Sequence, residues 1–116
     1  MSEAETRQVI ERYFDALGTD GFDRIVDTEV TWTVVETGRT VIGVTEVRRH
    51  LDALHAAMAD TATRPLIVGE ASAVLEGDAA AGAERIPFCV VYEVRGASVV
   101  AMRLYGRLEG AVLPGG

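Results

Sequence analysis

The chain has 116 residues, of which 48% are hydrophobic, so we expect one folded domain over residues 1–116 and exclude a disordered chain. Its formal net charge is −7 and all of its 11 basic residues are arginines, with no basic cluster for nucleic acid to bind. No apolar run approaches the roughly 20 residues that span a bilayer, the first residues show no signal peptide, and Cys89 has no second cysteine to pair with, so we expect a cytoplasmic protein without a membrane partner.

Apolar residues at helical spacing predict a first helix over about Glu3 to Leu17. Ser2 and Glu5 have the spacing of a capping box at its start, and Gly18 stands where a glycine ends a helix. A short second helix is expected over 21–27.

Two strands and a third helix are expected next. Residues 30–35 are rich in β-branched side chains and predict a strand. A turn at Thr37-Gly38 leads into a second strand over 39–43. Thr45 is expected to cap a helix that runs to about Ala59. Its apolar side is formed by Val47, Leu51, Leu54 and Met58.

The second half of the chain predicts four more strands. After Pro65, which interrupts a helix, a strand is expected over 66–75, followed by a hairpin turn at Glu76-Gly77-Asp78. The remaining strands are expected over 79–86, 88–94 and 98–108, with Pro87 at the end of the first of them. Residues 110–116, with three glycines and Pro114, are expected to be frayed.

This order predicts an α+β fold. We expect a strongly bent, mostly antiparallel sheet of six strands, wrapped as a cone around two or three helices. The open end of such a cone is a hollow in which a small apolar molecule has room to bind.

Two stretches resemble the nuclear transport factor 2-like superfamily, whose fold is the cystatin-like cone. They are Ile10-Glu11-Arg12-Tyr13-Phe14-Asp15-Ala16-Leu17 and Val99-Val100-Ala101-Met102-Arg103 followed by Tyr105-Gly106. The superfamily includes ketosteroid isomerases, SnoaL-like polyketide cyclases and limonene-epoxide-hydrolase-type enzymes. The resemblance therefore implies isomerisation, cyclisation or epoxide opening on a polyketide- or terpenoid-like molecule, without a cofactor, in a homodimer.

The catalytic residues of these enzymes match only in part. Tyr13 falls where the isomerases place the phenol that donates to the developing oxyanion. Their general base lies on the first strand, where this chain has Trp32, and their second acid lies where it has Phe88-Cys89-Val90. Glu84-Arg85 resembles the epoxide-hydrolase stretch that supplies an arginine, but Pro87 stands in place of its aspartate.

The candidate catalytic residues are Tyr13, His55 and Glu36. Tyr13 would polarise a substrate oxygen; its alternative is a core aromatic whose hydroxyl reaches water or backbone. His55 is the first candidate for the base, and Glu36 is a second, near the pocket mouth. His50 and His55 lie on opposite flanks of the apolar side of their helix, so the alternative for each is a partly exposed side chain without a catalytic role. The alternative for Glu36 is a solvated side chain.

Candidate substrate contacts are one arginine and a set of apolar residues. Arg85 would bind a ligand carboxylate or phenolate, with an outer-face salt bridge as its alternative. Trp32 would offer a flat platform, with a place in the core or rim as its alternative. The other walls are expected from Phe88, Val90, Met102, Leu54 and Met58.

No metal-ligand spacing, phosphate loop or nucleophile elbow occurs in the sequence, so neither metal nor cofactor is expected. The strand face with Arg103, Tyr105 and Arg107 mixes apolar and charged groups, and we expect the homodimer to form through this outer sheet face. The leading hypothesis is a cofactor-independent enzyme acting on a small apolar oxygenated molecule. A non-catalytic ligand-binding or dimerisation module is the alternative, and a structural member without a cavity is the third possibility.

Overall fold

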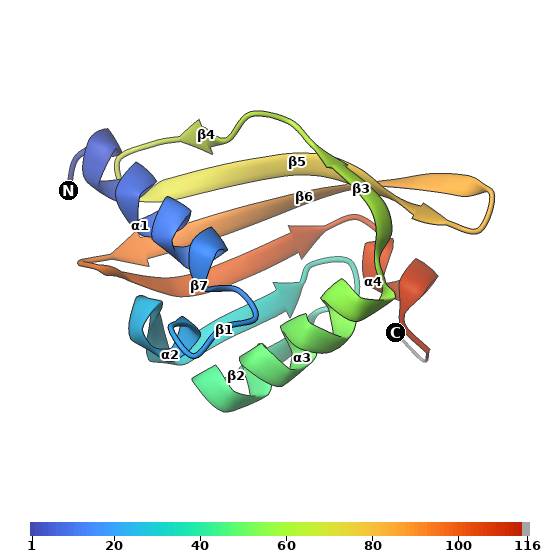
Figure 1. Ribbon diagram of the computed structural model, residues 1–116, viewed down its shortest axis with the longest axis horizontal. Helices are drawn as coiled ribbons and strands as arrows, with labels where there is room; N and C mark the ends of the chain where they lie inside the picture. Colours follow the sequence, from blue (N-terminus) through green and yellow to red (C-terminus); the bar gives the residue numbers. More distant parts are fainter. Residues whose placement is uncertain (115–116) are drawn as a thin grey trace.

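The computed structural model describes residues 1–114 and contains four helices and seven strands in that range (Figure 1). The helices are α1 (Glu3–Ala16), α2 (Phe22–Ile25), α3 (Val44–Ala57) and α4 (Leu108–Val112). The strands are β1 (Val26–Val34), β2 (Arg39–Ile42), β3 (Ala59–Thr63), β4 (Ile67–Val68), β5 (Ser72–Ala81), β6 (Glu84–Arg95) and β7 (Ser98–Tyr105).

The strands form one mixed sheet in the order β2-β1-β7-β6-β5-β3, with β4 also paired to β5. Strands β1 and β7 run parallel, and every other pair in this part of the chain is antiparallel. The α+β class and the mostly antiparallel sheet are confirmed. The number of six strands was wrong. The segment after α3 forms β3, the residues expected as one strand over 66–75 divide between β4 and β5, and those expected over 79–86 divide between β5 and β6.

One face of the sheet carries the core. Directly paired residues point to the same side, and the row Trp32, Met102, Tyr92 and Ala73 crosses four strands on that side. All four side chains are buried. The intervening residues, such as Arg103, are less buried and lie on the outer face. The helices therefore cover a single face, as period-two alternation on a one-sided sheet requires.

Helix α1 forms as its sequence predicts. The Ser2 hydroxyl accepts a hydrogen bond from the Glu5 backbone N–H, and the Glu5 carboxylate accepts one from the Ser2 N–H. These bonds satisfy N–H groups that have no partner inside the helix. The buried Thr6 donates to the carbonyl of Glu70 at 2.6 Å, which attaches the first turn to the loop before β5.

The hairpin expected at Glu76-Gly77-Asp78 was wrong, because these residues lie inside β5 and the turn falls at Gly82. Gly77 is needed for close packing instead. A Cβ at this position would lie 2.5 Å from the carbonyl oxygen of Ala62 on β3 and 2.9 Å from Cζ of Phe88. The glycine therefore allows an edge strand and an aromatic ring to approach the β5 backbone.

Pro87 does not end a strand as expected, because β6 continues through it from Glu84 to Arg95. The neighbouring strand explains why. The last pair between β6 and β7 joins Cys89 to Tyr105, so Pro87 has a strand partner only on the β5 side, where it pairs with Asp78. A proline without an N–H is tolerated at such an edge.

Four further boundaries differ from the expectation. Strand β1 begins at Val26 rather than at residue 30, and α3 begins at Val44 after Gly43, so Thr45 is not its cap. The strand expected over 98–108 ends at Tyr105. Residues 110–112, expected to be frayed, belong to α4, because Leu108 is buried and attaches this helix to the core. Residues 115–116 lie outside the described range.

The outer face of the sheet carries Arg103, whose guanidinium pairs with Glu93 at 2.9 Å, and Tyr105, which is 41% exposed. The homodimer expected through this face stays a prediction. Within residues 1–114, no helix combines the length and apolar character of a membrane-spanning segment.

Substitution of Gly77 by alanine should lower the free energy of unfolding by about 1–3 kcal/mol, the cost of forcing an extra carbon into a filled space. Urea denaturation measures it. Gly69→Ala is the matched control, because a Cβ there would lie 3.5 Å from its nearest neighbour, an ordinary contact. Equal stabilities of the two variants would contradict this account of the β3–β5 packing.

Candidate functional site

A buried glutamate joins three elements at the end of the sheet where β1 and β7 finish. Glu109 Oε2 accepts a hydrogen bond of 2.6 Å from Trp32 Nε1, and His50 Nε2 lies 2.8 Å from the same oxygen. The Glu109 and Trp32 side chains are almost fully enclosed, and the His50 side chain is 17% exposed. A carboxylate has no proton to donate, so the contact with His50 is a hydrogen bond in the tautomer that carries its proton on Nε2.

Each of the three residues comes from a different element. Trp32 stands on the inner face of β1, beside Met102 of β7. His50 lies on α3, next to the stripe that packs against β1 and β2. Glu109 follows the buried Leu108 on α4, a helix in contact with α3, β5 and β6. The short helix α4 therefore brings a carboxylate into contact with a side chain of α3 and a side chain of the sheet.

The two oxygens of Glu109 have different surroundings. Oε2 is held by Trp32 and His50, while no residue in the described range donates to Oε1. Glu109 is also one of the residues that line a pocket. A carboxylate held at one oxygen by two neighbours has a fixed orientation, which suits it to accept a proton at a defined point.

This pocket has a volume of ≈ 180 Å³. It lies between the β1–β2 turn and the segment around the start of α4, and its lining consists of Val34, Glu36, Thr37, Arg39, Gly106, Arg107, Glu109 and Gly110. An apolar cavity of about 150 Å³ is large enough for benzene. The pocket therefore has room for one ring or a molecule of similar size, and only part of a steroid-sized molecule would enter it.

Charged groups surround the pocket mouth. Arg107 is held by Glu84, with 2.7 Å between Nη2 and Oε2. Glu36 and Arg39 line the mouth as well, and neither forms an ion pair with another residue of the described range. Of the residues predicted for the site, Glu36 is the one that lines this pocket.

Tyr13 lies in an aromatic cluster away from this lining. It is 2% exposed, and its ring centroid is 5.5 Å from that of Tyr92 and 6.0 Å from that of Phe22. Burial, and then the neighbouring Tyr92, raise the pKa of Tyr13 well above its ordinary value. The phenol is therefore neutral at physiological pH, as a hydrogen-bond donor must be. Its role toward a ligand oxygen stays a prediction.

The structure does not bring His55 to the glutamate. His55 is exposed on α3, where partial burial lowers the pKa of its imidazole against the opposing effect of Asp52. His50, expected to be a boundary residue like His55, is the histidine that reaches Glu109. A general-base role for His55 stays a prediction, away from this pocket.

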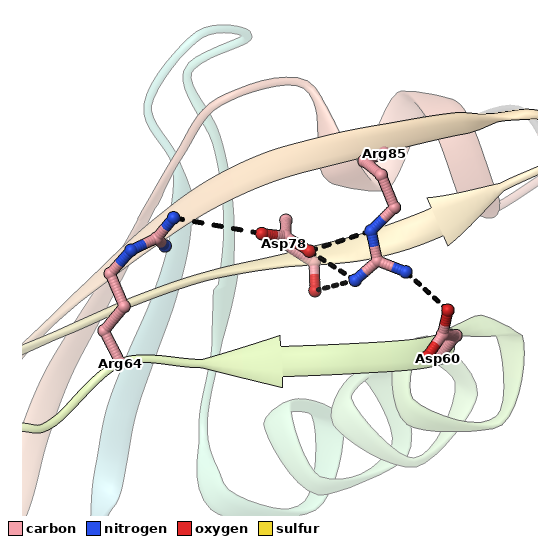
Figure 2. A network of polar contacts seen from close by, with 4 residues as sticks. All are labelled: Asp60, Arg64, Asp78 and Arg85. Atoms are coloured by element: carbon pink, nitrogen blue, oxygen red, sulfur yellow. Dashed lines mark hydrogen bonds and ion pairs between the residues drawn. The ribbon is translucent and has the colours of Figure 1, made fainter.

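Arg85 lies on the opposite side of β6 from the buried Ile86 and Phe88, in the salt-bridge arrangement that was its alternative. Its guanidinium donates to Asp78 and pairs with Asp60 at 2.6 Å (Figure 2). The hydrogen bond with Asp78 is the main cause that raises its pKa. Figure 2 shows Arg85 of β6 between Asp78 of β5 and Asp60 of β3, so its contacts in the structure join these three strands.

The remaining predicted contacts lie in or against the core. The indole N–H of Trp32 is occupied by Glu109. The residues Phe88, Val90, Met102 and Leu54 are buried, and Met58 packs partly buried against them. None of them belongs to the lining of the Glu109 pocket, and as substrate contacts they stay predictions.

Sequence reasoning missed Glu109 and the role of His50. Leu108 and Val112 are four positions apart, a spacing that indicates a helical turn, and this was the available signal for α4. The glutamate has no local partner that would have singled it out. Within residues 1–114, no three His, Cys, Asp or Glu side chains are close enough to hold a metal ion.

The arrangement of the sheet and helices matches solved structures. A steroid delta-isomerase from Pseudomonas aeruginosa superposes with a TM-score of 0.80 at 14% identity, over 96% of this chain and 85% of that one. A protein described as a SnoaL-like polyketide cyclase, from Jannaschia sp. CCS1, gives 0.73 at 13% identity, over 97% and 94%. The chain has the nuclear transport factor 2-like fold.

Likeness at these identities concerns the fold alone. A de novo designed protein with a curved β-sheet superposes with a TM-score of 0.73 at 21% identity, over 91% of this chain and 88% of that one. No protein-family model and no curated protein matches the chain. The nuclear transport factor 2-like fold thus carries enzymes and a designed scaffold alike, and function has to be argued from the site.

Replacing Glu109 with alanine should lower the free energy of unfolding by about 3 kcal/mol, because two buried donors lose their acceptor. Glu109→Gln should cost about 1 kcal/mol, since its amide oxygen still accepts from Trp32 and His50. Chemical denaturation followed by tryptophan fluorescence measures both. Glu36→Ala, in the exposed turn, should stay within about 0.5 kcal/mol of the wild type, and an equal loss there would contradict the assigned role of Glu109.

The raised pKa of Tyr13 predicts a loss of stability in alkali. Above about pH 10 the unfolded phenol ionises while the folded one keeps its proton, so the free energy of unfolding falls as pH rises, by up to about 1.4 kcal/mol per pH unit for each such tyrosine. Tyr13→Phe should make this fall less steep in denaturation curves taken across the alkaline range. Tyr105→Phe, at an exposed position, should leave the slope unchanged, and identical slopes for all three proteins would contradict the prediction.

Proposed function

We propose that this protein is a cofactor-independent enzyme that moves a proton on a small, largely apolar, oxygenated molecule, in an isomerisation or cyclisation. The observation that carries the proposal is a buried glutamate that Trp32 and His50 hold at one oxygen and that lines a pocket. Solved proteins of this fold that are described as a steroid delta-isomerase and a polyketide cyclase support the reaction class.

In this proposal Glu109 is the general base. Oε1 takes a proton from the carbon next to a substrate carbonyl, which leaves an enolate and a neutral Glu109, and the proton then returns at another carbon. Trp32 and His50 hold the carboxylate in place, so its orientation is fixed before substrate binds. The same group would remove the proton whose loss starts an aldol-type ring closure.

The test measures proton transfer on ketones that fit the pocket. Cyclohexanone in deuterated buffer reports α-proton exchange by NMR, and cyclohex-3-enone reports isomerisation to the conjugated ketone. The wild type should accelerate both, and Glu109→Gln should reduce the enzymatic rate by about 10²–10⁴-fold.

Two comparisons make this test specific. Glu36→Gln removes the other carboxylate at the pocket and should retain the rate if Glu109 is the base. A fall with Glu36→Gln but not with Glu109→Gln would assign the base to Glu36 and contradict the proposal. Wild-type rates equal to those of buffer with both ketones would favour the alternative, a non-catalytic binding module.

A further inference from the structure

We infer that the ligand of the Glu109 pocket is an organic anion of about one ring, held by its carboxylate at Arg39 and directed with its other end toward Glu109. The inference rests on the proposed function for the choice of pocket and adds the substrate class. It depends on three observations: the side of the sheet that carries Arg39, the charges that have no ion-pair partner within residues 1–114, and the size of the cavity.

Strand register places Arg39 on the pocket side. Arg39 is directly paired with Val34, and directly paired residues of antiparallel strands point to the same face. Val34 is buried, lies beside Leu104 of β7 on the core face and lines the pocket. Arg39 thus extends the core face at the edge strand and is one of the residues that line the pocket.

The charges near the mouth are not equivalent. The Arg107 guanidinium is already bound to Glu84, and the Glu109 carboxylate is already bound by two N–H donors. Arg39 forms no ion pair with the residues of the described range, and neither does Glu36. Glu36 follows the end of β1 in the exposed turn, whereas Arg39 shares a face with the lining residue Val34. A ligand in the pocket therefore meets Arg39 as a cation that pairs with no carboxylate of residues 1–114.

Chemistry and size then define the ligand. A guanidinium matches a carboxylate through two parallel hydrogen bonds, which makes arginine selective for such groups. The volume of ≈ 180 Å³ admits about one ring beside it. A ring carboxylate bound in this way would present its far edge, with a carbonyl or hydroxyl group, to Oε1 of Glu109.

Another use of Arg39 predicts a different outcome. An inward-pointing charge on an edge strand discourages pairing with a second sheet. If protection of β2 were its function, substitution of Arg39 would promote self-association and leave ligand binding unchanged. Measuring the binding of probes that have equal shape and different charge distinguishes a ligand-binding role of Arg39 from protection of the edge strand.

The experiment is an NMR chemical-shift titration near neutral pH with benzoate, benzyl alcohol and benzylammonium. The wild type should bind benzoate at least about tenfold more tightly than either other probe, and Arg39→Gln should weaken benzoate about 10–100-fold. Arg95→Gln is the control. It removes an arginine at the end of β6 that is far from the pocket, and this variant should bind benzoate like the wild type. Equal affinity for the three probes, tighter binding of benzylammonium, absence of binding, or an unaffected Arg39→Gln would each overturn the inference.

Failure of the proposed function gives a distinct result. Glu109→Gln should still bind benzoate, because the carboxylate of the probe is held at Arg39. If benzoate binding depends on Arg39 but the protein transfers no proton on the ketones, the anion site is supported and the catalytic role of Glu109 is contradicted. If the protein transfers protons but does not prefer the anion, the catalytic role is supported and the anion site is contradicted.

Discussion

A carboxylate held inside the protein by two N–H donors is the interaction on which the candidate site depends. Placing a charged group out of water is costly unless partners compensate it. Trp32 and His50 supply that compensation to Glu109 from two different elements. The positions of β1, α3 and α4 are therefore linked, since displacement of any one of them leaves a buried polar group without its partner.

The same contacts support the proposal of chemistry at this site. Trp32 and His50 hold Glu109 at one oxygen, and the residue also lines a pocket. The fold alone does not decide between catalysis and a structural role, because the same sheet and helices also occur in a designed protein. The candidate site depends on the two residues that anchor the glutamate, Trp32 and His50.

Local patterns in the sequence predicted the parts that local physics determines. The capping box of α1 and the inward face of β6 follow from spacing alone, and both were found. Gly77 was misread as a turn, because a glycine required by a neighbouring strand looks like a glycine required by a bend. The role of Glu109 was not predicted, because its partners are 59 and 77 positions away in the sequence and no local pattern indicates contacts at such a separation.

The parallel pairing of β1 with β7 has a consequence for how the protein folds. The two strands come from the first and last thirds of the chain, whereas the β5–β6 and β6–β7 hairpins join near neighbours. Contacts between distant segments form slowly, because closing a long loop is entropically costly before any contact rewards it. Refolding chains would therefore acquire their hairpins first, and ligand affinity would arise only in the final, slowest kinetic phase.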